Sequence, residues 1–165
     1  MRQALGSIVF TTWLFLSVPP YGIVALVVRL FGYPAMYAVA RSWCRMHISL
    51  LRVLCGLDYV VEGLEHLPDR SAVVLMKHSS SWETIAQLLL FPRQTWVLKR
   101  ELIWAPVLGW AILGMKPIAI DRKGGRAAVE QVIRLGRRRL EEGLWVVVFP
   151  EGLCSLAFSK PLTVN

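Results

Sequence analysis

Acidic residues and cysteines are scarce in this chain, which limits the kinds of site it can form. Its 165 residues include 11 Asp and Glu against 19 Lys and Arg, so the formal net charge is +8. The three cysteines, Cys44, Cys55 and Cys154, are odd in number and form no Cys-x-x-Cys pair, which argues against a disulfide framework and against a metal or redox site. We therefore expect reduced core cysteines in a protein that faces the cytoplasm.

Charge is absent altogether from residues 3–28. An uninterrupted helix of this length could span a bilayer, which requires about 20 residues. Pro19 and Pro20 lie in the middle, however, and adjacent prolines break or kink a helix, so two shorter helices over 5–18 and 21–31 that dip into one leaflet are equally plausible. A secretory signal peptide would need a cleavage site of small residues, which we do not find. Because 55% of the chain is hydrophobic, we expect a retained membrane anchor.

The following segment, residues 34–55, predicts a helix with one charged stripe. Arg41, Arg45 and Arg52 fall on the same side at 100° per residue, and the rest of the surface is mostly apolar. Such a helix could lie at a membrane interface with its arginines at anionic headgroups, or it could be a core helix with one solvated face. With the anchor it makes residues 1–55 a region of membrane-anchoring and interfacial helices.

Short apolar strands alternate with helices after Gly56, and no repeat or low-complexity linker interrupts them. This alternation predicts an α/β fold with a central sheet and flanking helices. The expected strands are residues 59–62, 72–76, 95–98, 117–120 and 145–149, and the expected helices are 82–90, 105–113 and 125–142. We assign residues 56–152 to one domain of this kind and treat 153–165 as an atypical tail.

The first candidate site is the segment Lys77-His78-Ser79-Ser80-Ser81-Trp82-Glu83, which follows a predicted strand. Ser81 is a suitable N-cap for a helix that begins at Trp82, and Glu83 would then lie in its first turn. The turn could fold Glu83 back onto the imidazole of His78, which suits a general base. A surface histidine and a glutamate that merely caps a helix explain the same residues. A serine nucleophile is disfavoured because Gly-x-Ser-x-Gly is missing.

Two further candidate sites also end predicted strands. Arg122 precedes a glycine-rich turn that opens a helix, an arrangement that suits a phosphate but could equally be a solvated basic turn. Lys99, at the end of an earlier strand, could reach the same side. The segment Phe149-Pro150-Glu151-Gly152 closes the clearest strand and can aim a carboxylate at the hydroxyls of a substrate. The carboxyl ends of strands are where open α/β sheets place their sites.

The order of these motifs resembles the glycerol-phosphate and lysophosphatidic acid acyltransferase family. That family has a His, four residues and an Asp, then a Gly…Ile-Asp-Arg segment and a Phe-Pro-Glu-Gly-Thr-Arg segment. The resemblance covers residues 56–152 and includes Val97-Leu98-Lys99-Arg100-Glu101-Leu102. Two departures stand out. Glu83 replaces the usual Asp. Leu153-Cys154 replaces Thr-Arg, and from this second departure we expect a C-terminal truncation.

The resemblance implies a role for each matched residue. His78 is implied as the general base and Glu83 as its orienting acid. Arg122 and Lys99 would bind the phosphate of the acceptor, and Glu151 and Gly152 would shape the acceptor site. The family uses acyl-CoA or acyl carrier protein as the donor and requires no metal or other cofactor.

The expected activity is transfer of a fatty acyl group to the sn-2 hydroxyl of lysophosphatidic acid, a step of phospholipid synthesis. We expect the protein at a bacterial inner membrane, on the cytoplasmic face, where an acyl donor is available. A truncated, inactive membrane-surface protein of the family, or a lipid A type acyltransferase, is the alternative. Nucleic acid is not an expected partner, because the run Arg137-Arg138-Arg139 lies on the outer face of an amphipathic helix.

Overall fold

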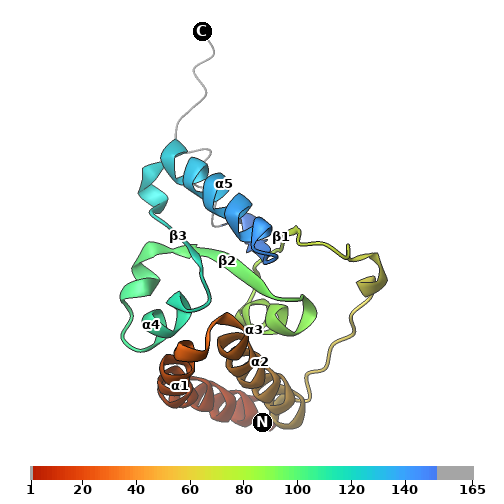
Figure 1. Ribbon diagram of the computed structural model, residues 1–165. Coiled ribbons are helices and arrows are strands. Elements are labelled where there is room, and N and C mark those ends of the chain that lie inside the picture. Colours follow the sequence, from red (N-terminus) through yellow and green to blue (C-terminus); the bar gives the residue numbers. More distant parts are fainter. Residues whose placement is uncertain (1, 152–165) are drawn as a thin grey trace.

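The computed structural model of this chain describes residues 2–151. An antiparallel helical hairpin comes first, and an alternation of strands and helices follows (Figure 1). In chain order the elements are α1 (Arg2–Val28), η1 (Arg29–Phe31), α2 (Tyr33–Leu50), η2 (Leu51–Cys55), η3 (Leu64–His66), β1 (Val73–Leu75), α3 (Ser81–Leu90), β2 (Gln94–Lys99), η4 (Arg100–Trp104), α4 (Leu108–Leu113), β3 (Ile118–Ile120), η5 (Arg122–Gly124), α5 (Arg126–Glu141) and β4 (Trp145–Val148).

The four strands of the described chain form one parallel sheet in the order β1-β4-β2-β3. Val74 pairs with Val147, Trp96 with the same Val147, and Leu98 with Ala119. The predicted α/β class is therefore confirmed. Because all pairings are parallel, the carboxyl ends of the strands meet at one edge, which is the edge where the sequence predicts its site residues.

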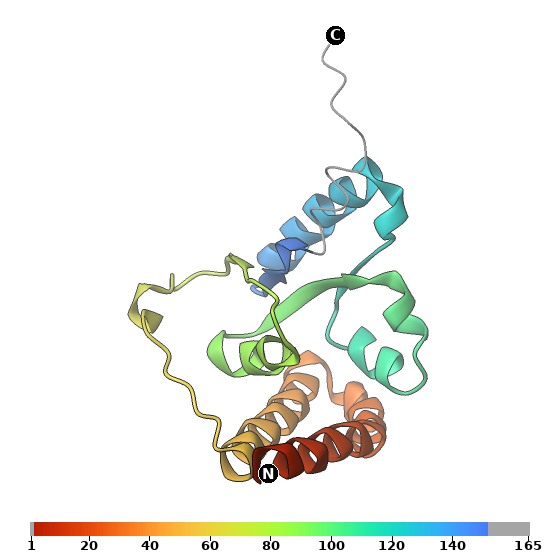
Figure 2. The ribbon, with the colours of Figure 1, turned by 180° about the vertical axis from the view of Figure 1, so that it is seen from behind.

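Helices cover both faces of the sheet (Figures 1 and 2). On one face, α5 packs the apolar stripe predicted from its sequence against β3 and β4, with Ile118 and Val146 at the centre. On the other face, α3 lies between the sheet and α2, and Ile85 and Leu88 of α3 contact Met36 and Cys44 of α2. Burial raises the pKa of the Cys44 thiol to about 12, so this buried free cysteine is held neutral.

The N-terminal segment is one helix through both prolines, which decides between the two arrangements that the sequence left open. Lateral contacts hold α1 on either side of Pro19. Before it, the Ser17 hydroxyl lies 3.2 Å from Nε2 of His47 and accepts a hydrogen bond of 3.0 Å from the indole of Trp43. After it, Gly22 packs closely against Val107. These tertiary contacts compensate for the backbone hydrogen bonds that proline cannot make.

The apolar stretch at Gln3–Phe31 is long enough to cross a membrane, and only 17% of its most apolar window is buried within the protein. Large side chains on its outer side are exposed, among them Leu5, Ile8, Phe15, Leu16, Ile23 and Val27. A core helix of a soluble protein would bury such side chains. The predicted anchor region is thus present as an apolar helix with most of its surface free.

One predicted strand is wrong in the structure, and one predicted helix is present but shorter than predicted. Residues 59–62 pair with no strand among the described residues. Instead, Asp58 forms an ion pair of 3.1 Å with Arg52, and the ring of Tyr59 packs edge-on against Trp82 at 5.1 Å. The helix predicted for 105–113 begins only at Leu108. Pro106, Val107 and Leu108 form a tight turn with a 2.6 Å hydrogen bond, which the periodicity of apolar residues could not reveal.

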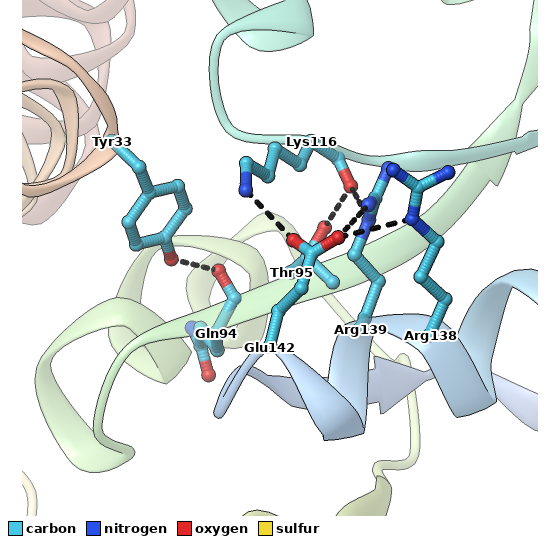
Figure 3. Close-up of polar contacts among 7 residues, drawn as sticks. All are labelled: Tyr33, Gln94, Thr95, Lys116, Arg138, Arg139 and Glu142. Atoms are coloured by element: carbon cyan, nitrogen blue, oxygen red, sulfur yellow. Dashed lines mark hydrogen bonds and ion pairs between the residues drawn. The ribbon is translucent and has the colours of Figure 1, made fainter.

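Polar contacts join α5 to the sheet at the amino ends of its strands, opposite the predicted site (Figure 3). The carboxylate of Glu142 accepts hydrogen bonds from Lys116 at 2.7 Å, Arg138 at 3.2 Å and Arg139 at 2.9 Å. The carbonyl of Lys116 in turn accepts from Thr95 and from Arg139. Lys116 has a φ of 54°, in the left-handed region that non-glycine residues rarely adopt, so these contacts hold a strained turn.

Candidate active site

His78 lies three residues beyond the end of β1, at the carboxyl edge of the sheet. Its Nδ1 lies 3.8 Å from Oε2 of Glu83, so the structure brings the two predicted partners together. The separation is that of an ion pair and is longer than a hydrogen bond, a spacing that catalytic pairs often show before a substrate binds. About half of the His78 side chain, 46%, is exposed, so the imidazole is open to a substrate.

Glu83 is held by the start of helix α3. The N-cap is Ser80, not Ser81 as predicted, and α3 begins one residue earlier than expected. The Ser80 hydroxyl accepts a hydrogen bond from the backbone N–H of Trp82 at 3.1 Å and donates one of 3.0 Å to the Glu83 carboxylate. The backbone N–H of Ser80 donates to the same carboxylate oxygen at 2.7 Å. These contacts form a capping box, which sets the position of the acid through the helix itself.

The same contacts keep Glu83 charged. Partial burial is the largest single influence and by itself would raise the pKa of the carboxyl group. The backbone N–H groups of Glu83 and Ser80, the Ser80 hydroxyl and the nearby His78 act in the opposite direction, and together they lower the pKa below its ordinary value. A carboxylate that stays ionised can stabilise the positive charge that an imidazole gains when it accepts a proton.

The turn after β4 lies beside His78. Leu75 pairs with Val148, and the N–H of Met76 donates to the carbonyl of Val148 at 2.9 Å, so both chains leave the sheet together. The ring of Phe149 then packs against the imidazole of His78, with 4.8 Å between ring centroids. Glu151 lies three residues after the end of β4, just as His78 lies three residues after the end of β1, and Glu151 is exposed. The remaining predicted residue of this turn, Gly152, lies outside the described residues.

The two predicted phosphate-binding cations belong to the neighbouring strands. Lys99 ends β2 and pairs in register with Ile120 of β3; its side chain is half exposed and lies 3.4 Å from Glu101. Arg122 begins η5 directly after β3, and its side chain lies outside the described part of the structure. Across the edge, the strand order therefore places the histidine at β1, the Phe-Pro-Glu turn at β4, the lysine at β2 and the arginine position at β3.

This arrangement suits proton transfer from a substrate whose phosphate binds nearby. The Nδ1 atom of His78 faces Glu83, so Nε2 points away from the acid and can accept a proton from a hydroxyl group. Lys99 and the position of Arg122 lie farther along the same edge, where a phosphate could bind. His78 and Glu83 come from one segment, whereas Lys99 and Arg122 follow other strands, so it is the sheet that brings them all to one edge.

Two features of this site were not recognised from the sequence. Ser80 is the cap that holds Glu83, and its signal was the spacing Ser-x-x-Glu, which is the sequence pattern of a capping box. Phe149 supports the imidazole from β4, and no local signal could have shown this, because the contact depends on the pairing of β1 with β4.

The profile of the acyltransferase family matches residues 58–162 of this sequence. A 1-acyl-sn-glycerol-3-phosphate acyltransferase of Pseudomonas aeruginosa is 40% identical over 152 residues, which is 91% of this chain and 59% of that protein. The enzyme of the same name from Cocos nucifera is 29% identical over 88% of this chain and 48% of its own length. The alpha form of Homo sapiens is 32% identical over 66% of this chain and 39% of its own length.

The chain therefore belongs to the acyltransferase family, as its motifs predicted. Its similarity lies with the 1-acyl-sn-glycerol-3-phosphate acyltransferases of bacteria, plants and animals. No solved structure matches the chain significantly. The chain spans less than two thirds of the length of each of these relatives.

Proposed function

We propose that this chain transfers a fatty acyl group from acyl-CoA or acyl carrier protein to the sn-2 hydroxyl of lysophosphatidic acid, which yields phosphatidic acid. The names of the relatives support this substrate. The single observation that carries the proposal is the pairing of His78 with Glu83 at the carboxyl edge of the sheet, 3.8 Å apart.

In the proposed reaction, Nε2 of His78 takes the proton of the glycerol hydroxyl as the oxygen attacks the carbonyl carbon of the thioester. A C–O bond forms and a tetrahedral oxyanion results. The C–S bond then breaks, and the thiolate leaves with the proton that the imidazolium returns. Glu83 stabilises the imidazolium in between, which is the role expected of a carboxylate beside a general base. The reaction needs neither an oxidant nor a metal ion.

The acceptor is proposed to lie along the edge of the sheet. Its phosphate would bind to Lys99 and Arg122, and its glycerol part would contact Glu151 and Gly152, beside His78. A phosphate suits cations at strand ends next to a helix start. The strand order supports this layout, since β4 and β2 lie between the histidine and the Arg122 position.

The proposed substrate and the surface of α1 both support a membrane location. Lysophosphatidic acid is a lipid, and the exposed apolar surface of α1 offers a way to bind the bilayer that contains it. We propose the cytoplasmic face of a bacterial inner membrane, because the acyl donors are cytoplasmic and the chain carries a net charge of +8 that suits anionic lipid.

The test is a set of substitutions that separate the charge of Glu83 from its role as a cap. Glu83→Gln retains an acceptor for the Ser80 N–H, because a capping box accepts Gln as well as Glu, but it removes the charge. We expect Glu83→Gln to lower kcat and Glu83→Asp to retain activity. His78→Ala should lower kcat by about 10²–10⁴-fold, the usual contribution of general acid–base catalysis. The assay measures radiolabelled phosphatidic acid formed by the vesicle-bound chain.

His66→Ala is the matched control, because His66 is also paired with a glutamate, Glu65, at 3.4 Å but lies on the surface away from the sheet edge. It should leave turnover unchanged. Substantial turnover by His78→Ala, or full activity of Glu83→Gln, would contradict the proposed base and its partner. Binding to vesicles without transfer by the unsubstituted chain would instead support a membrane-surface protein that lacks activity.

A further inference from the structure

A second uncharged stretch, beyond the apolar N-terminus, follows the predicted phosphate-binding lysine. From Leu102 to Met115 the sequence has no charged residue. The stretch forms η4, a tight turn and the short helix α4. Its small residues face inward: Gly109 and Ala111 are buried, and a Cβ atom at Gly109 would overlap the backbone of Ile103. Met115 is buried as well, but several of the other large residues lie on the outside.

Five large apolar residues of this stretch are exposed, which is unfavourable in water. Trp104 is 74% exposed and Trp110 is 50% exposed, and Leu102, Leu108 and Leu113 are exposed as well. Tryptophan combines a large apolar surface with one N–H group, and it is enriched where a membrane meets water. Several exposed large apolar side chains within one uncharged stretch indicate an interaction surface.

The stretch that carries these exposed residues packs against α1. Helix α4 packs along α1 (Figures 1 and 2), and a Cβ atom at Gly22 would lie 2.5 Å from Cγ1 of Val107. The neighbours of Gly22 on the outer side of α1, Ile23 and Val24, are exposed apolar residues. A bilayer that covers this part of α1 therefore also reaches the stretch beside it.

We propose that residues 102–113 form a second lipid-contacting surface, in which Trp104 and Trp110 enter the membrane interface. This inference rests on the proposed insertion of α1. The stretch begins three residues after Lys99, at the carboxyl edge of the sheet. The predicted acceptor site thus opens at the level of the lipid headgroups, and a lysophospholipid can reach it from the bilayer without crossing water.

Cysteine labelling tests the depth of each surface. A fluorophore sensitive to polarity is attached to Trp104→Cys, Trp110→Cys, Ile8→Cys or Ile133→Cys, each with Cys154→Ser. Ile8 on α1 is the reference for insertion, and Ile133 on α5 is the matched control, because it is an apolar residue with 59% exposure on the opposite face of the sheet. The parent with Cys154→Ser alone corrects for labelling of buried Cys44 and Cys55. Vesicles contain phosphatidylethanolamine, phosphatidylglycerol and a nitroxide-labelled lipid that quenches nearby fluorophores.

We expect the labels at 8, 104 and 110 to shift to shorter wavelength on vesicles and to be quenched, whereas the label at 133 stays in water. If the labels at 104 and 110 behave like the one at 133 while the label at 8 inserts, the second surface is refuted and the anchor stands. If the label at 8 also stays in water, the proposed insertion of α1 and the second lipid-contacting surface are both refuted. A shift at 104 that depends on protein concentration and needs no lipid would identify an interface between proteins and overturn the inference.

Discussion

Replacement of Glu142 by Gln should lower the stability of the protein without changing its chemistry. Glu142 follows α5 (Figure 3). It lies near the amino ends of the strands, whereas His78 lies at their carboxyl ends. Its carboxylate contacts three cations, Lys116, Arg138 and Arg139, at 2.7 to 3.2 Å. The substitution retains the shape of the side chain but removes the charge that these contacts share.

The expected loss follows from the exposure of these groups. An ion pair at the surface contributes about 0.2–1 kcal/mol. Glu142 and Arg139 are only 25% and 15% exposed, so we place the three pairs together at about 1–2 kcal/mol of the free energy of unfolding. For a chain of this length, about 1 kcal/mol lowers Tm by about 2–4 °C. The expected decrease in Tm is therefore about 2–8 °C.

The pH dependence gives an independent check. The hydrogen bond from Lys116, more than any other influence, holds the pKa of Glu142 below its ordinary value, and Arg139 and Arg138 act in the same direction. A carboxyl group with a lowered pKa stabilises the folded state above its ordinary pKa of about 4.3, and that contribution is lost as the pH falls through the lowered value. The difference in Tm between the unsubstituted chain and Glu142→Gln should thus be constant near neutral pH and should disappear at acidic pH.

Thermal unfolding in mild detergent, followed by circular dichroism, measures these differences. Glu141→Gln is the control, since the adjacent Glu141 is exposed and forms no ion pair in the described structure. High salt should reduce the effect of Glu142→Gln, because it screens partly exposed charges. Equal Tm values for the two variants at neutral pH and low salt would refute the proposed contribution.

Three further predictions concern the site and the helical hairpin. Ser80→Ala should destabilise α3 by about 1 kcal/mol and lower turnover, measured by unfolding and by the acyltransfer assay. Ser17→Ala leaves the indole N–H of Trp43 without its buried acceptor, so it should lower the free energy of unfolding by about 1–3 kcal/mol. Burial lowers the pKa of His47, so the protein should lose stability as the pH falls below about 6.5, and His47→Gln should remove that part of the decrease.

Matched variants make these predictions specific. Ser80→Thr keeps a capping hydroxyl and should restore most of the stability, whereas an equal loss with Thr would contradict the cap. For the hairpin, Ser42→Ala is the control, because the Ser42 hydroxyl is exposed and bonds only to Val39 within its own helix. If Ser42→Ala lowers the free energy of unfolding as much as Ser17→Ala does, the buried hydrogen bonds of Ser17 do not contribute the predicted stability. An unchanged acid profile in His47→Gln would show that His47 does not titrate on unfolding.

Local patterns predicted the elements whose pattern of apolar residues is regular along their whole length. The β-branched run before Phe149 became β4, and the amphipathic pattern after Gly125 became α5 with its apolar stripe on the sheet. Residues 59–62 have the composition of a strand but make no pairing in the structure. A strand needs hydrogen bonds to another strand, and here Tyr59 packs on Trp82 instead.

The sequence alone predicted the family and the α/β class, and it suggested which residues could perform the chemistry, because these predictions depend on short patterns at the ends of strands. The sequence predicted that Glu83 would meet His78, but the tertiary structure alone decided which turns of different strands lie side by side. The order β1-β4-β2-β3 puts the last described strand beside the first, so Phe149 supports His78 across 71 positions of sequence. Contacts with α2 and α4 likewise decided that α1 continues through two prolines. Pairings between distant segments depend on the whole fold, and no local preference of the residues involved specifies them.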